Sequence, residues 1–373
     1  MNIRKIIRNY NTRELTIGVL GSHSALDVCC GAKDEGFQTL VVCQSGREKT
    51  YHDYYRTNGD LGCVDSCIIL PKFSDILDKE IQKELLKRNV IFVPHRSFEV
   101  YLQSNYKTIE NDFVVPMFGN RYLLKIEERG VKPNQYDLLD AANIRHPKIY
   151  ENPKDIDRLC LVKVLEKERG FERAFFMVED FIDYQEKSQQ KIKMGKISEQ
   201  QLESAVVEEF ILGAQVNFNF FFSPISKRLE LMGTDTRRQT NIDGIIRTPA
   251  TYQEQLLKTI SISYEEAGHI AVTVLESLLE DAFAMGERFV KASQKLYPPG
   301  VIGPFALQTI ITPGPPKKGI IVIDVSPRVP GSPGISATPY SNYLYAKPVS
   351  VGRRIAMEIL KGIDDNILVR IIT

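Results

Sequence analysis

The chain lacks the features that are typical of membrane, secreted or nucleic-acid-binding proteins. No stretch of its 373 residues approaches the roughly 18 apolar residues that a membrane helix needs, and the opening MNIRKIIRNYN contains no apolar run of signal length. We therefore expect a cytoplasmic protein that binds no membrane. Lysine plus arginine (48) nearly balance aspartate plus glutamate (47), so no general field would hold a nucleic acid. An anionic ligand must be bound locally.

Cysteines are few, and most of them stand among apolar residues, so we expect buried free thiols. Cys63 and Cys67 resemble half of a zinc site, but no second pair or histidine cluster completes it. The chain also has no internal repeat. The turn after its first strand reads GSHSAL and lacks GxGxxG, which argues against a nicotinamide dehydrogenase. The six cysteines are Cys29, Cys30, Cys43, Cys63, Cys67 and Cys160.

The remaining composition is globular, with 43% hydrophobic and 25% charged residues. Single cores stop growing at about 250 to 300 residues, so this length predicts two or three packed lobes. Residues 15–43 read as a strand, a helix and a strand, and further strands at 67–70 and 90–93 flank a helix at 79–88. This alternation predicts a parallel α/β sheet in a first lobe, residues 1–115.

Two further lobes of α+β type are expected, over residues 116–204 and 205–373. In the third lobe, residues 214–222 alternate polar and apolar before a turn, and RLELMGTD follows, which predicts a hairpin. The other expected elements of these lobes are helical stretches at 121–142 and 181–204, strands at 159–165, 174–178 and 206–212, a helix at 276–296, the strands GPFALQTIIT and GIIVIDVS, and a closing helix VGRRIAMEIL.

Polar residues follow two strands of the first lobe. Gly21-Ser22-His23-Ser24 comes after the first strand, and Pro94-His95-Arg96-Ser97-Phe98 comes after the fourth. Ligands of open α/β sheets bind outside the carboxyl ends of the strands, and helix N-termini bind phosphates there. The two segments together favour an anionic ligand. The alternative is that the serines cap helices and that His95 and Arg96 are solvated loop residues.

Charged residues in the later lobes are candidates for binding a nucleotide. Lys163 lies inside an apolar strand, where a cation needs an anionic partner. Lys125 lies on a helical stretch, and Glu208 and Glu209 end the strand VVEEFIL, where a carboxylate can take ribose hydroxyls. Solvent-facing lysines and an ordinary strand end are the alternatives.

A second group of polar residues lies in the last pair of strands. Gln308 is in the middle of one strand and Asp324 near the end of the next, where their oxygens would suit Mg²⁺ that also binds substrate phosphates. Arg328 follows and can neutralise a transferring phosphoryl group. The alternative is that each is simply hydrogen-bonded within the sheet.

Several long segments together resemble the archaeal formate-dependent aminoimidazole carboxamide ribotide ligases, or FAICAR synthetases, of the PurP family. The resemblance spans nearly the whole chain, and many of its segments are long and unusual. Among them are GSHSAL (21–26), PHRSF (94–98), VKVLEKERGFERAFF (162–176), EEFILGAQVNFNFFFSP (208–224), TNIDGIIRTPA (240–250), YPPGVIGPFALQ (297–308) and DVSPRVPGSP (324–333).

The resemblance implies an ATP-grasp fold preceded by a Rossmann-like parallel-sheet lobe, and an ATP-dependent carboxylate-amine ligase. It implies that His23 and Ser97 contact the ribotide, together with Asn241 and His269. It further implies that Lys163 and the Glu208–Glu209 strand hold ATP, with Gln308 and Asp324 at the metal. Arg237 and Arg238 are added to the ribotide site on charge and position alone.

The implied reaction joins formate to the amine of 5-aminoimidazole-4-carboxamide ribonucleotide in purine biosynthesis, with ATP and Mg²⁺ or Mn²⁺. Arg328 would stabilise the phosphoryl group, and His23 is a candidate to take the amine proton. The chain departs from the family at Asp324, where glutamate in a motif like FEVS is common. Alternatives are a ligase for another acid or amine and a non-catalytic nucleotide sensor. We also expect a homo-oligomer.

Overall fold

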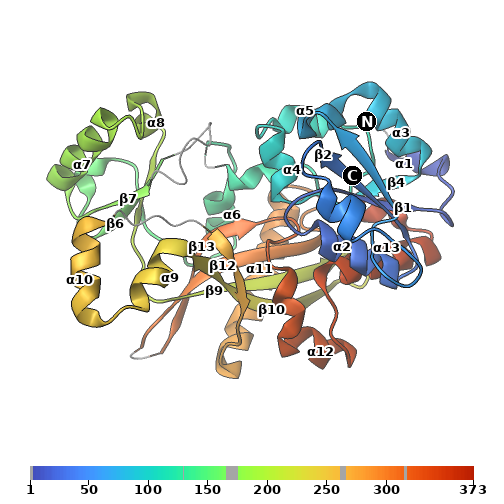
Figure 1. Cartoon of the computed structure of the whole chain (residues 1–373). Helices are drawn as coiled ribbons and strands as arrows, with labels where there is room; N and C mark the ends of the chain where they lie inside the picture. Colours follow the sequence, from blue (N-terminus) through green and yellow to red (C-terminus); the bar gives the residue numbers. More distant parts are fainter. Residues whose placement is uncertain (1–2, 129, 165–174, 261–265, 315–316) are drawn as a thin grey trace.

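The computed structural model describes residues 3–128, 130–164, 175–260, 266–314 and 317–373. Part of the expected motif VKVLEKERGFERAFF and the first residue of the strand expected at 174–178 lie outside these ranges. Figure 1 shows the first lobe at the right, a smaller lobe at the upper left, and a large sheet that runs below and between them. The first described residues and the C-terminus both lie at the first lobe.

The first lobe contains a parallel sheet in the order β3-β2-β1-β4. Apolar side chains cover both faces, as a parallel sheet requires: Val19 and Val41 face one core, and Leu20 and Leu40 face the other. The Rossmann-like lobe is therefore confirmed. Its elements are α1 Ile3–Arg8, β1 Thr16–Leu20, α2 Ala25–Asp34, β2 Gln38–Gln44, η1 Thr50–Tyr54, β3 Ser66–Leu70, η2 Phe73–Leu77, α3 Lys79–Lys87, β4 Val90–Phe92, α4 Arg96–Tyr101 and α5 Tyr106–Asn111.

The end of the chain packs back onto this first lobe. Helix α13, Val351–Asp364, crosses α2 so closely that a Cβ on Gly31 would lie 1.9 Å from the backbone nitrogen of Arg353. A side chain larger than hydrogen at Gly31 is therefore excluded by the crossing. The backbone of Thr373 also exchanges two hydrogen bonds with Met117, of 2.9 and 2.8 Å.

The second sheet is antiparallel, in the order β5-β8-β6-β7. Strand β8 belongs to this sheet, although the predicted boundary between residues 204 and 205 assigns it to the third lobe. The predicted lobe boundaries remain predictions, and the strand pairing favours one after residue 209. The elements of this region are η3 Leu124–Glu127, α6 Gln135–Ala141, β5 Ile149–Tyr150, η4 Pro153–Asp155, β6 Cys160–Lys163, β7 Phe175–Val178, α7 Phe181–Lys193, α8 Glu199–Glu203 and β8 Val206–Glu209.

The large sheet is antiparallel, in the order β11-β10-β9-β12-β13, and contains the predicted hairpin as β9 and β10. One face is apolar: Phe220 stacks on Phe305, whose ring centroid lies 5.5 Å from that of Phe289 on α11. The other face bears polar side chains such as Asn217 and Asn219, and further along the same strand its Phe221 packs into the core of the first lobe. The elements are β9 Ala214–Ser223, β10 Arg228–Gln239, α9 Thr240–Ile246, α10 Ala250–Thr259, β11 Glu266–Ala271, η5 Glu276–Leu278, α11 Leu279–Leu296, β12 Gly303–Thr312, β13 Gly319–Ser326, η6 Pro333–Ala337, α12 Pro339–Tyr345 and η7 Leu368–Arg370.

The cysteines are free thiols, but they are not all buried. Cys29, Cys43, Cys63 and Cys160 are buried, whereas Cys67 is partly exposed and Cys30 exposed. The prediction of a buried thiol was wrong for Cys30, because it follows Cys29 on α2 and successive helical side chains point about 100° apart. Among the helices of the described ranges, none is long and apolar enough to cross a membrane.

Candidate active site

The two polar segments of the first lobe meet, as expected, at the carboxyl edge of the parallel sheet. Strands β1 and β4 are neighbours, and the Ser97 hydroxyl donates to the Ser22 hydroxyl at 3.0 Å. His23 has a φ of 52°, a conformation that is uncommon for a residue with a Cβ. Its ring stacks on that of His95 with 5.3 Å between centroids. His23 and Ser97 thus come from distant parts of the chain to one place.

His95 is a structural residue of this edge. Its side chain is fully buried, and its Nε2 donates to the carbonyl oxygen of Leu20 at 2.9 Å. Burial disfavours the charged imidazolium and lowers the pKa of His95 to about 4. His95 is therefore neutral near pH 7 and supplies no positive charge to an anion.

A row of polar residues crosses the large sheet on one face. Asp324, Gln308, Asn217 and Asp235 are successive partners across β13, β12, β9 and β10. Directly opposite residues of an antiparallel pair share a face, so all four side chains project from the same side. Figure 1 shows these four strands side by side. The apolar core occupies the opposite face.

Asp235 lies at the centre of a buried network at one end of this row. Asn217 and Asn219 donate their side-chain N–H groups to its two oxygens at 2.9 and 2.6 Å, and His269 Nδ1 lies 2.5 Å from Oδ2. Burial alone would raise the pKa of Asp235, but these hydrogen bonds outweigh it and lower that pKa. Asp235 is therefore ionised and holds His269 in one orientation.

His23 and His269 join the two halves of the site. A Cβ placed on Gly331 would lie 2.9 Å from Nε2 of His23 and 3.3 Å from Nε2 of His269, so both imidazoles approach the same backbone position. Ser332 Oγ lies 2.9 Å from Nδ1 of His269. The segment after β13 therefore passes between the edge of the parallel sheet and the polar face of the large sheet.

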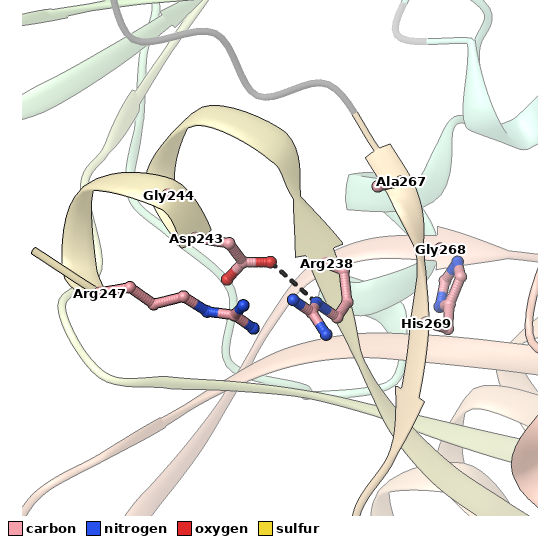
Figure 2. A pocket seen from close by; sticks show the side chains of 7 residues that line it. All are labelled: Arg238, Asp243, Gly244, Arg247, Ala267, Gly268 and His269. Carbon is pink, nitrogen blue, oxygen red and sulfur yellow. Dashed lines mark hydrogen bonds and ion pairs between the residues drawn. The ribbon is translucent and has the colours of Figure 1, made fainter.

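Arg238 lines a cavity of about 460 Å³ beside these residues (Figure 2). Its Nε donates to Asp243 at 3.1 Å, and Arg247 extends toward the same place. Figure 2 shows the His269 ring on the side of β11 away from the two arginines. Strand alternation explains this arrangement, because Arg237 is opposite His269 and Arg238 is opposite Gly268. Arg237 therefore shares the polar face, and Arg238 does not.

Asn241 lies in α9, and its side chain is outside the part of the structure that is described. Its predicted contact with the ribotide remains a prediction.

The expected metal ligands, Gln308 and Asp324, would suit a metal ion that also binds the phosphates of a nucleotide. Gln308 and Asp324 are opposite each other, and Gln308 accepts a hydrogen bond from Arg237 at 2.8 Å. The buried Oδ1 of Asn217, opposite Gln308, has no hydrogen-bond partner among the described residues. No cluster of three or more histidine, cysteine or acidic side chains that could hold a metal occurs in these ranges. One carboxylate and amide oxygens suit Mg²⁺ that binds mainly phosphates and water.

The predicted nucleotide-binding residues Lys163 and Glu208 form a buried ion pair in the second sheet. Tyr136 also donates its hydroxyl to Glu208, at 2.7 Å. The neighbouring residue on α6, Gln135, accepts a hydrogen bond at 2.7 Å from the backbone nitrogen of Val325, which follows Asp324. Helix α6 thus connects the nucleotide candidates to the metal candidates.

Glu209 and Lys125 have other neighbours. Glu209 points away from Glu208, as successive strand residues do, and pairs with Arg158 at 3.2 Å. Lys125 pairs with Glu110 on α5 at 2.9 Å.

Arg328 is buried in an ion-pair cluster next to α4. Its Nε lies 3.0 Å from Glu99, and its Nη2 lies 2.7 Å from both oxygens of Glu127. Arg96 also contacts Glu127, at 2.7 Å. The charge of Arg328 is therefore already balanced by carboxylates in this structure.

Sequence reasoning missed Asp235, Asn217 and Asn219. The asparagines carried a signal, because they occupy alternate positions of the strand AQVNFNFFFS and so project from its polar face. Asp235 gave no comparable signal, since it is one acid near the middle of a strand whose partners were unknown.

The parallel-sheet lobe and the two antiparallel sheets together form the ATP-grasp fold. The structure is similar to that of an N5-carboxyaminoimidazole ribonucleotide synthetase solved as its ADP complex, with a TM-score of 0.57 over 90% of this chain and 78% of the other. The two sequences are 9% identical, so this likeness shows the fold alone.

Closer relatives show the family. The chain is 38% identical to a 5-formaminoimidazole-4-carboxamide-1-(beta)-D-ribofuranosyl 5'-monophosphate synthetase of Methanopyrus kandleri, over 100% of this chain and 98% of that one, and equally to the synthetase of Methanothermobacter thermautotrophicus. It also resembles the crystal structure of an IMP biosynthesis protein PurP from Thermococcus kodakaraensis, at 28% identity and a TM-score of 0.69 over 96% and 100% of the two chains.

Two family models, described as a protein of unknown function (DUF1246) and a domain of unknown function (DUF1297), match residues 17–150 and 183–373. The chain belongs to the PurP family of these synthetases.

Proposed function

We propose that the protein is a ligase that formylates 5-aminoimidazole-4-carboxamide ribonucleotide with ATP and formate, and releases ADP and phosphate. One structural observation carries the proposal: His23 and His269 approach one backbone position between the parallel sheet and the polar face that bears Gln308 and Asp324. The full-length similarity to synthetases named for this product supports the choice of substrates.

Formate is a poor acylating agent, so its oxygen must first be phosphorylated. Attack on the γ-phosphorus of ATP would give formyl phosphate, and attack of the ribotide amine on that carbon would then release phosphate. Mg²⁺, held by Gln308 and Asp324 together with the phosphates, would supply charge stabilisation. The ammonium of Lys163 is the buried cation that would bind a phosphate of ATP. On binding it, Lys163 would leave its present ion-pair partner, Glu208.

The ribotide would occupy the edge of the parallel sheet. The hydroxyl of Ser97 and the imidazole of His23 are donors of the kind that bind a phosphate or ribose oxygens, and they lie next to α2 and α4. Asn241 and His269 complete the proposed ribotide contacts. A cytoplasmic location and a homo-oligomer remain predictions.

Isotope transfer tests the proposed reaction. If formyl phosphate forms, oxygen-18 placed in formate must appear in the released phosphate, because the oxygen that attacks the γ-phosphorus leaves with it. Labelled acetate is the matched control. Transfer from acetate but not from formate would indicate a ligase for another acid. Hydrolysis of ATP with no labelled phosphate and no formylated product would indicate a nucleotide-binding protein that is not this ligase.

A further inference from the structure

The polar face of the large sheet contains a histidine whose environment differs from that of the other two histidines at the site. His269 lies on the edge strand β11, and its Nδ1 is 2.5 Å from the carboxylate of Asp235 on β10. The side chain of Asp235 is almost completely buried, and that of His269 is 12% exposed. A buried carboxylate thus lies behind a partly accessible imidazole.

This arrangement fixes the protonation of the ring. The carboxylate of Asp235 only accepts hydrogen bonds, because its pKa is lowered, so Nδ1 of His269 carries a proton. In the neutral imidazole the proton acceptor is then Nε2, which is the nitrogen that approaches Gly331. If Nε2 takes a proton, the imidazolium forms against a carboxylate that stabilises it.

His23 also approaches Gly331, but a different group lies behind its ring. Ser24 donates its single hydroxyl proton to the carbonyl oxygen of Pro330 at 2.8 Å, so it accepts from Nδ1 of His23 at 3.1 Å. A neutral hydroxyl therefore lies behind His23, and the ring stacks on His95. The Ser24 hydroxyl carries no charge, whereas the carboxylate of Asp235 next to His269 is ionised.

We propose that His269 is the general base of formyl transfer, with Asp235 as its positioning residue; this rests on the proposed function. In that step the lone pair of the ribotide amine forms a bond to the formyl carbon. Nε2 of His269 takes one proton from that nitrogen. The bond between the formyl carbon and the phosphate oxygen breaks, and phosphate leaves with the electron pair.

The charged groups around His269 set the form of the pH dependence. Asp235 favours the imidazolium, whereas Arg237, opposite His269 on β10, disfavours it. His23 faces the ring across Gly331, and Arg238, Asp243 and Arg247 lie on the other side of β11. The rate should rise with pH as His269 loses its proton, and Asp235→Asn should shift this rise to lower pH, because the imidazolium loses its counter-ion.

Three variants test the proposal in the full-length enzyme: His269→Ala, His269→Gln, which retains an N–H donor for Asp235, and His23→Ala. Single-turnover formation of formylated ribotide should fall roughly 100-fold or more in both His269 variants. Formyl phosphate formation, followed by positional isotope exchange in ATP with formate alone, should change less than about twofold, since His269 acts only in the transfer. Thermal unfolding shows whether each variant is folded.

Chemical rescue separates a base from a structural residue. Added imidazole should restore transfer in His269→Ala, whose truncation leaves space for that ring, and should not restore it in His23→Ala. If His269→Ala transfers formyl at the wild-type rate, or if imidazole rescues only His23→Ala, His269 is not the base, although the proposed function stands. If the wild-type enzyme forms no formylated ribotide, the proposed function fails, and the assignment of His269 fails with it.

Discussion

The two sides of the candidate site contain similar residues, but they differ in whether their ionisable groups are neutral, paired or charged next to the site. At the edge of the parallel sheet, His95 is kept neutral by burial, and Arg328 is paired with two carboxylates. On the polar face of the large sheet, Asp235 is ionised beneath His269, and the buried Oδ1 of Asn217 has no partner within the described ranges. The ion pairs of the edge are formed before a ligand arrives, although the buried Nδ1 of His95 has no hydrogen-bond partner within the described ranges. The face, in contrast, contains an ionised carboxylate and an amide oxygen to which a ligand could bind.

This difference suggests a division of roles. Balanced groups hold a backbone in place, because a fully paired charge gains little from a new partner. An acceptor that lacks a hydrogen-bond partner gains most from a bound cation. A histidine next to a carboxylate gains most from a proton. The edge would therefore position the ribotide, and the face would supply the chemistry.

The largest expected effect is on stability and concerns the edge. Arg328→Met leaves Glu99 and Glu127 buried with one cation fewer, so the free energy of unfolding should fall by about 3–5 kcal/mol. Urea denaturation measures this change. Arg247→Met is the matched control, because this exposed arginine has no ion pair among the described residues and its loss should change stability by less than about 0.5 kcal/mol.

A catalytic rather than a structural role of Arg328 would contradict the contrast between the edge of the parallel sheet and the polar face of the large sheet. If Arg328→Met unfolds like the wild type but loses turnover, its charge acts on the phosphoryl group, as the sequence suggested, and the edge is not merely a scaffold.

The next effect concerns the neutral imidazole of the edge. The pKa of His95 is lowered to about 4 in the folded protein, whereas an unfolded histidine titrates near 6.5. The unfolded chain therefore takes up the proton first, so stability contributed by His95 is present above pH 6.5 and is lost as the pH falls toward 4. The loss should be about 3 kcal/mol.

Urea denaturation between pH 7 and 4 checks this prediction by comparing the wild type with His95→Asn. The variant should lose less stability over this range, while the exposed control His52→Asn should follow the wild type. If the free energy of unfolding of His95→Asn falls with decreasing pH as steeply as that of the wild type, another group causes the loss of stability in acid.

Much of the site was predictable from sequence, because parallel strands end at a common edge and consecutive strands of a hairpin pair. The first rule brings Ser97 to Ser22, the residue before His23, and the second brings Gln308 to Asp324. Lys163 shows where such rules stop. Its need for an anion was predictable, but its partner Glu208 became visible only when β8 was found to pair with β6 rather than with the third lobe.

The remaining contacts of the site depend on the register in which neighbouring strands pair, and a single sequence does not reveal that register. Arg237 and Arg238 are adjacent, but only the pairing of β10 with β11 shows which of them shares a face with His269. The contact between Asp235 and His269 joins residues 34 positions apart through the same pairing. The position of a charged residue within its own strand does not reveal which side chain of the neighbouring strand it will contact.

A smaller effect, on turnover, tests the face. Asp324→Asn removes the carboxylate available to Mg²⁺ without opening a cavity, so kcat should fall by at least about tenfold while stability is retained. Steady-state rates over a range of Mg²⁺ concentrations measure this loss. Asp281→Asn, which removes an exposed acid of α11, is the control. Unchanged turnover of Asp324→Asn at saturating Mg²⁺ would exclude Asp324 as a metal ligand.

The smallest effect distinguishes positioning from chemistry within the site. His23 has a left-handed backbone, so this measurement uses His23→Asn rather than the His23→Ala of the rescue experiment, because asparagine tolerates that conformation better than alanine does. The imidazole is lost while the turn is kept. The KM for the ribotide should rise about fivefold, the size expected when a single hydrogen bond between uncharged groups is removed, whereas kcat and the KM for ATP should change less than twofold. Steady-state kinetics with each substrate varied in turn separates these quantities. A fall in kcat as large as that of His269→Gln, with the ribotide KM unchanged, would place chemistry at the edge and remove the contrast between the two sides.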